Sequence, residues 1–139
     1  MRDLKQDRLK STKLFATLDR KELDALSEAT TELTVKAGTM LAREGHTGHE
    51  AFVILEGKVD IIVDGQKVNT LGQDEIVGEL ALLLHEPRQA SLLAATDVRL
   101  LVIEPGRFEE LLNRIPSMAR QLVVSLARRL RDADALLHH

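Results

Sequence analysis

One acid and one base lie nine residues apart, on either side of a short apolar stretch. Glu79 follows Gly78, Arg88 follows Pro87, and the residues between them are mostly apolar. The N-terminus of a helix exposes backbone N–H groups, and a guanidinium offers a fixed fork of donors, so together they can bind one anion. We therefore interpret residues 77–91 as a phosphate-binding cassette.

The composition argues against several other kinds of chemistry. The 139 residues include no cysteine and carry a formal net charge of −3, so there is no thiolate, no disulfide and no overall basic charge to attract nucleic acid. Three phenylalanines are too few for a surface on which bases stack. No apolar run is long enough for a membrane span, and the charged N-terminus lacks the apolar stretch of a signal peptide. We expect a cytoplasmic protein with neither nucleic acid nor membrane as a partner.

The segments around the cassette predict one domain over residues 1–139. Residues 1–30 are expected to be helical. Residues 31–104 alternate glycines with short apolar runs, which is typical of short strands joined by tight turns, and residues 106–137 predict C-terminal helices. The expected fold class is α+β: an antiparallel β-barrel or jelly roll with N-terminal helices, a short internal phosphate-binding helix and a long C-terminal helix.

Local signals predict where some of these elements lie. Asp19 with Glu22 is a capping-box pattern that should begin a helix. Asp64-Gly65 predicts a two-residue hairpin, and the segment 50–56, apolar on both faces, predicts a central, covered strand. The expected strands are 32–36, 40–42, 50–56, 58–63, 66–71, 91–95 and 98–103.

The last helix, from Pro116 to about Leu137, has apolar residues at alternating spacings of four and three. Such a heptad seam predicts a homodimer through this helix, and the alternative is a single helix folded onto its own barrel. We interpret the basic residues Arg128, Arg129 and Arg131 as a solvated face. The seam consists of Ala119, Val123, Leu126, Leu130, Ala133 and Leu137.

Several motifs extend the pattern beyond the cassette. They are Gly45-His46-Thr47-Gly48, Ile54-Leu55-Glu56-Gly57-Lys58-Val59, Leu71-Gly72, Gly78-Glu79-Leu80-Ala81-Leu82 and Pro87-Arg88-Gln89-Ala90-Ser91. From about Leu14 to about Asp134, the chain resembles the cyclic nucleotide-binding domain family. It is similar to a catabolite activator protein-like sensor domain without the DNA-binding domain, and we expect no helix-turn-helix after Asp134.

The resemblance implies a role for each residue of the cassette. Glu79 would accept a hydrogen bond from the ribose 2′-hydroxyl, and Arg88 would pair with the cyclic phosphate. Backbone amides in the cassette would bind the phosphate and sugar. The expected ligand-binding residues are Gly78, Glu79, Leu80, Ala81, Arg88, Gln89, Ala90 and Ser91.

The resemblance leaves the base of the nucleotide open. Gln89 stands where the family often has Ala for cyclic AMP and Thr for cyclic GMP, so cyclic AMP is the expected ligand and cyclic GMP the alternative. Arg131 and Asp134 on the last helix are candidate base or lid contacts. His46 and His49 stand where the family commonly has acidic residues, in a turn that we expect to lie away from the phosphate.

We expect a sensor or regulatory module, not an enzyme, with no cofactor and no metal. It would transmit ligand binding through its C-terminal helices to an effector that is separate or missing from the chain. One alternative is an interaction or dimerisation module of the same fold that has lost its ligand. Another is a cupin-like metalloenzyme using His46, His49 and Glu50, although these residues lack the His-x-His spacing of a cupin.

Overall fold

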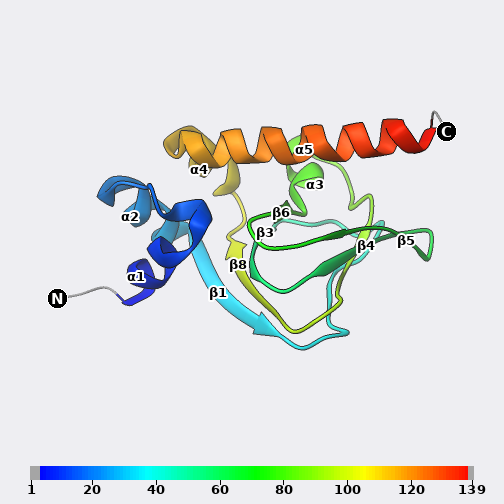
Figure 1. Cartoon of the computed structure of the whole chain (residues 1–139), viewed down its shortest axis with the longest axis horizontal. Helices are drawn as coiled ribbons and strands as arrows, with labels where there is room; N and C mark the ends of the chain where they lie inside the picture. The colour runs from blue at the N-terminus through cyan, green and yellow to red at the C-terminus, as the bar shows by residue number, and fades with distance from the viewer. Residues whose placement is uncertain (1–3, 138–139) are drawn as a thin grey trace.

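The computed structural model describes the backbone of residues 4–137 and the side chains within that range, except those at positions 4, 13, 80, 81 and 134–137. Three short helices come first, and Figure 1 shows them at one end of the molecule. They are α1 (Leu4–Ser11), the 3₁₀ helix η1 (Lys13–Phe15) and α2 (Arg20–Ala29).

The capping box predicted at Asp19 begins α2. The Asp19 carboxylate accepts a hydrogen bond from the Glu22 backbone N–H at 2.8 Å, and the Glu22 carboxylate accepts one from the Asp19 N–H at 3.0 Å. Leu23, Leu26 and Ala29 are buried on one face, so α2 packs against the rest of the chain through the predicted apolar side.

Within residues 4–137, eight strands form two antiparallel sheets of four. Their orders are β1-β8-β3-β6 and β2-β7-β4-β5. This is the two-sheet jelly-roll form of the expected α+β fold class, which is confirmed; the described strands do not close into a continuous barrel. The strands are β1 (Thr30–Val35), β2 (Met40–Ala42), β3 (Ala51–Glu56), β4 (Val59–Val63), β5 (Gln66–Leu71), β6 (Ile76–Val77), β7 (Ser91–Ala94) and β8 (Val98–Ile103).

The strand β3 is central, as its two apolar faces predict. It pairs with β8 on one side and β6 on the other, and residues Ala51 to Leu55 are all buried. Val53 faces the core shared with the helices, whereas Ile54 faces the core between the sheets. The predicted hairpin is also present, because Asp64 and Gly65 both have positive φ and join β4 to β5.

Three helices complete the chain: α3 (Glu79–Leu84), α4 (Phe108–Arg114) and α5 (Pro116–Leu137). In Figure 1, α5 runs along one side of the molecule and passes over α3. Among residues 4–137 there is no helix with the length and hydropathy needed to cross a bilayer.

The packing of α5 follows a different face from the predicted seam. Met118, Leu122 and Ser125 are buried against the domain, whereas Val123 and Leu130 are 65% and 72% exposed. The first half of the helix therefore folds onto its own chain, as the alternative interpretation has it. The outer apolar residues remain available for a second copy, so the homodimer stays a prediction.

Candidate functional site

The cassette begins at the end of β6 and turns through a glycine into α3. Gly78 has φ of +81°, and a Cβ at this position would meet Arg88 Nη1 at 2.7 Å. A side chain is therefore excluded both by the backbone conformation and by the arginine. The helix α3 ends at Leu84, before Pro87, because His85 adopts a left-handed φ of +54° that no helix continues.

The guanidinium of Arg88 is buried and fixed by backbone carbonyls. Arg88 is only 7% exposed; its Nη1 donates to the Gly78 carbonyl at 2.7 Å and its Nη2 to the Glu50 carbonyl at 2.6 Å. Burial lowers the pKa of Arg88, and the carboxylates of Glu50 and Glu79 oppose this lowering. An arginine stays charged nonetheless. No side-chain ion pair to Arg88 is present among the described residues.

The turn at residues 45–50 wraps around Arg88. Gly45 N–H donates to the Arg88 carbonyl at 2.8 Å, and Arg88 N–H donates to the His46 carbonyl at 2.9 Å. A Cβ on Gly48 would overlap the guanidinium itself. In the structure, the turn that we expected to lie away from the phosphate contacts Arg88, the residue predicted to pair with that phosphate. Backbone hydrogen bonds between residues some forty positions apart bring this turn and Arg88 together, and no local pattern in the sequence predicts such pairing.

The carboxylate of Glu79 is only 1% exposed and pairs with an arginine from α5. Arg129 Nη1 donates to Glu79 Oε1 at 2.6 Å, and Arg129 Nη2 donates to the Ile76 carbonyl at 2.5 Å. Arg129 also contacts Ser125 Oγ, which donates to the Glu75 carboxylate. The last helix is thus tied directly to the first residue of the cassette helix.

Sequence reasoning missed Arg129, which we interpreted as part of a solvated face. A signal was available in its spacing: Met118, Leu122, Ser125 and Arg129 recur at intervals of four, three and four, on the buried side of α5. A buried glutamate needs a cationic or hydrogen-bonding partner, so this arginine was a candidate for that role.

The structure brings five of the predicted residues around one small cavity. This cavity has a volume of about 80 Å³, and Arg129 lies in its wall with Ile61, Val77 and Leu92. Gln89 Nε2 donates to Glu86 at 3.0 Å, and Glu86 is not among the residues that line this cavity. The five predicted residues are Gly78, Glu79, Arg88, Gln89 and Ala90.

The other predicted residues lie elsewhere or outside the described part. Ser91 Oγ accepts a hydrogen bond from the Glu44 N–H at 3.0 Å, and Arg131 is exposed and pairs with Asp132 at 3.2 Å. Neither is among the cavity-lining residues. The backbones of Leu80 and Ala81 lie in α3 and that of Asp134 in α5, but these three side chains are outside the described residues.

The geometry does not provide the metal centre that a cupin-like enzyme requires. Within the part of the chain that the structure describes, no three His, Asp or Glu side chains are grouped so as to hold a metal ion. His46, His49 and Glu50 therefore do not form such a group, although their turn contacts Arg88.

The fold and cassette match a known family. The family model "Cyclic nucleotide-binding domain" matches residues 32–115. The chain therefore belongs to the cyclic nucleotide-binding domain family, and the resemblance noted from its motifs is confirmed. This is a family of regulatory domains that are typically non-catalytic.

Three relatives show how far the similarity extends. A cGMP-dependent protein kinase of Toxoplasma gondii is 31% identical over 81% of this chain and 11% of its own length. A Cyclic AMP receptor protein of Thermus thermophilus is 31% identical over 91% of this chain and 61% of its own. The regulatory domain of Toxoplasma gondii PKA, solved with cAMP, is 28% identical with a TM-score of 0.63, covering 80% of this chain and 46% of that one. The chain spans only part of each.

Proposed function

We propose that the chain is a sensor that binds cyclic AMP in the cassette, performs no chemistry and transmits binding through α5. The observation that carries this proposal is the placement of Arg88 and Glu79 around one cavity, with Arg88 fixed by carbonyl groups. A cationic fork and a buried acceptor beside each other suit a ligand that has both an anionic phosphodiester and a sugar hydroxyl.

Arg88 is suited to the cyclic phosphate by its charge. Its two carbonyl partners accept hydrogen bonds but carry no full negative charge, so its positive charge has no side-chain ion pair among the described residues. A monoanionic phosphodiester supplies that charge. Two carbonyl contacts hold the guanidinium before the ligand arrives, which lowers the entropic cost of binding.

Glu79 connects the ribose to α5. The ribose 2′-hydroxyl would donate to the same carboxylate that now accepts from Arg129, so ligand and α5 compete for it. The cavity of about 80 Å³ is smaller than the usual small-molecule site of about 300–1,000 Å³. Binding therefore requires α5 or the cassette to move, and this movement is the proposed signal. A nearly complete switch between two packings of α5 requires about 5.5 kcal/mol of differential affinity.

Cyclic AMP is preferred to cyclic GMP in this proposal because Gln89 offers no hydroxyl at its position. Its amide is held by Glu86 at 3.0 Å. The relatives' names do not decide the base, since one is a cGMP-dependent kinase and another a Cyclic AMP receptor protein. A contact to the base from Arg131 would require α5 to repack, because Arg131 now faces solvent, and Asp134 stays a predicted base contact.

A second copy and an effector are the proposed protein partners. Val123 and Leu130 are large apolar side chains left exposed on α5, and they suit a parallel or antiparallel helix pair. The same observation supports the second candidate function, a dimerisation module without ligand. In that case Arg129 would occupy the position opposite Glu79 permanently.

A competition panel separates these functions. The chain has no Trp or Tyr, so a fluorescent cyclic AMP analogue is the tracer, and cyclic AMP, cyclic GMP and 5′-AMP are the competitors. We expect cyclic AMP to displace the tracer at the lowest concentration and 5′-AMP, a dianion with an open phosphate, to compete at least tenfold less well. A folded dimer that binds no cyclic nucleotide at millimolar concentration would instead establish the dimerisation module.

A further inference from the structure

A cavity larger than the one at Glu79 and Arg88 lies in another part of the described structure. It has a volume of about 510 Å³ and lies between the end of α3, the start of α4 and the turn at residues 47–49. This volume falls in the range of about 300–1,000 Å³ that is typical of small-molecule sites. The proposed cyclic nucleotide site makes no use of this cavity, because only the cassette cavity contains Glu79 and Arg88.

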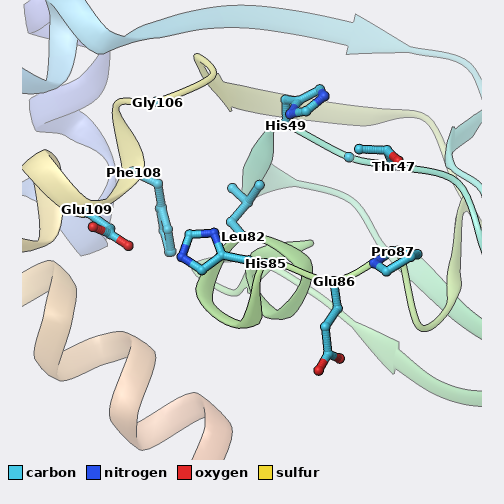
Figure 2. A pocket seen from close by; sticks show the side chains of 10 residues that line it. Thr47, His49, Leu82, His85, Glu86, Pro87, Gly106, Phe108 and Glu109 are labelled. Carbon is cyan, nitrogen blue, oxygen red and sulfur yellow. The ribbon is translucent and has the colours of Figure 1, made fainter.

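The walls of this cavity, which we call the α3–α4 cavity, combine an apolar interior with polar side chains. Figure 2 shows Leu82 projecting from the cassette helix α3 and His85 from the position just after its end, Phe108 and Glu109 from the start of α4, and His49 on the opposite side. Phe108 is 4% exposed and belongs to the helical core, so its ring is a fixed part of the wall.

The charge of the lining selects between kinds of ligand. Two carboxylates, those of Glu86 and Glu109, line the cavity, and none of its lining residues is a lysine or arginine. Glu86 already accepts from Gln89, whereas no ion pair of Glu109 occurs among the described residues. The guanidinium of Arg88 lies behind Gly48, whereas the carboxylate of Glu109 at the start of α4 has no such neighbour in the lining, so this end of the cavity favours a cation.

We propose that the α3–α4 cavity binds a small apolar molecule that carries a protonated amine. The apolar body packs against Leu82, Pro87 and Phe108, and the ammonium group pairs with Glu109. His49 and His85 place imidazole nitrogens, which can form hydrogen bonds, beside the ligand's polar end.

An occupant of this cavity touches the parts that the cyclic nucleotide site depends on. Gly48, in the cavity wall, lies against the guanidinium of Arg88, and α3 starts at Glu79. The other wall is the start of α4, which leads into α5. The amine should therefore change the affinity for cyclic AMP, and this coupling, unlike the amine site itself, rests on the proposed function.

The experiment uses three molecules of nearly equal size that differ in charge: phenethylammonium, 2-phenylethanol and 3-phenylpropionate. Each is titrated into the ¹⁵N-labelled chain while amide shifts are recorded. We expect saturable shifts at residues 47–49, 82–86 and 106–109 with phenethylammonium. Binding should be at least fivefold weaker for the alcohol and undetectable for the carboxylate.

A matched pair of variants tests the role of the carboxylate. Glu109 and Glu110 both lie in the first turn of α4, but only Glu109 lines the cavity. Both side chains are exposed, so an ion pair with either is weak. E109Q should therefore lower the affinity for phenethylammonium by about two- to fivefold, and E110Q should leave this affinity unchanged. Equal shifts for all three probes, equal effects of the two variants, or shifts confined to α5 would overturn the amine site.

Coupling is measured as the dissociation constant of cyclic AMP with and without saturating phenethylammonium. We expect a change of at least threefold, with the same factor in the amine's own affinity. If the amine binds but the affinity for cyclic AMP does not change, the proposed coupling is wrong, whereas the proposed amine site is still supported. If the chain binds no cyclic nucleotide at all, the proposed function is wrong. The amide shifts caused by the three probes still show whether the amine site exists.

Discussion

The guanidinium of Arg129 lies 2.6 Å from the carboxylate of Glu79, a residue fifty positions earlier in the chain. This ion pair joins α5 to the first residue of α3, and Glu79 is almost fully buried in it. In the proposed function, a sugar hydroxyl that takes over Oε1 of Glu79 would loosen this link. The pair therefore gives a physical route from ligand binding to a change in the packing of α5.

Loss of Arg129 should destabilise the chain because it leaves a buried carboxylate without its cation. We expect R129Q to lower the free energy of unfolding by about 2 kcal/mol, below the range for a fully buried pair because Arg129 is 23% exposed. Urea unfolding followed by circular dichroism measures this. The neighbouring exposed residue supplies the control, since R128Q should stay within about 0.5 kcal/mol of wild type. Equal stability of the two variants would contradict the structural role of the pair.

The ribose role of Glu79 predicts a loss of sugar selectivity. Wild type should bind cyclic AMP about ten- to a hundredfold more tightly than 2′-deoxy cyclic AMP, because a hydrogen bond to a buried carboxylate is lost. In E79Q this ratio should fall to about threefold or less. Competition against a labelled nucleotide measures both ratios. An unchanged ratio would remove Glu79 from the sugar site.

Gly48 should be required for binding because its missing side chain leaves room for Arg88. A Cβ there would overlap the guanidinium, so G48A should displace Arg88. The affinity for cyclic AMP should then fall by at least about tenfold. Gly72 is the matched control: a Cβ there would have no neighbour closer than 3.9 Å, and its φ is outside the left-handed region. Binding by G48A that equals binding by G72A would show that the clamp around Arg88 is dispensable.

The exposed face of α5 predicts self-association. Wild type should sediment as a dimer at micromolar concentration, and the double variant V123S/L130S should be a monomer with an unchanged circular dichroism spectrum. Both side chains are more than three-fifths exposed, so their loss costs the monomer little. If the wild-type chain is a monomer even at the highest concentration examined, the prediction that Val123 and Leu130 form a dimer interface is wrong.

The sequence predicted best what depends on neighbours in the chain. The capping box at Asp19, the hairpin at Asp64-Gly65 and the covered strand β3 each follow from a few adjacent residues, and each is present. The strand β6 was not predicted, because two residues at positions 76 and 77 are too few to show a period of two.

The sequence predicted least what depends on which surfaces meet. The heptad seam identified an apolar side of α5, but the helix packs through Met118 and Leu122 instead of Val123. That choice places Arg129 beside Glu79. The contact between the turn at residues 45–50 and Arg88 was likewise not predicted, since the hydrogen bonds of Arg88 to the His46 and Glu50 carbonyls connect distant parts of the chain.

Calorimetry of cyclic AMP with wild type and R88K tests the central claim most directly. Lysine keeps the positive charge but loses the fork that reaches both Gly78 and Glu50. The control is R99K, at an arginine on β8 whose side chain is 34% exposed. The account predicts saturable binding of one nucleotide per chain in wild type and R99K, and at least about tenfold weaker binding in folded R88K. Equal affinity in R88K, or no binding by folded wild type, would contradict it.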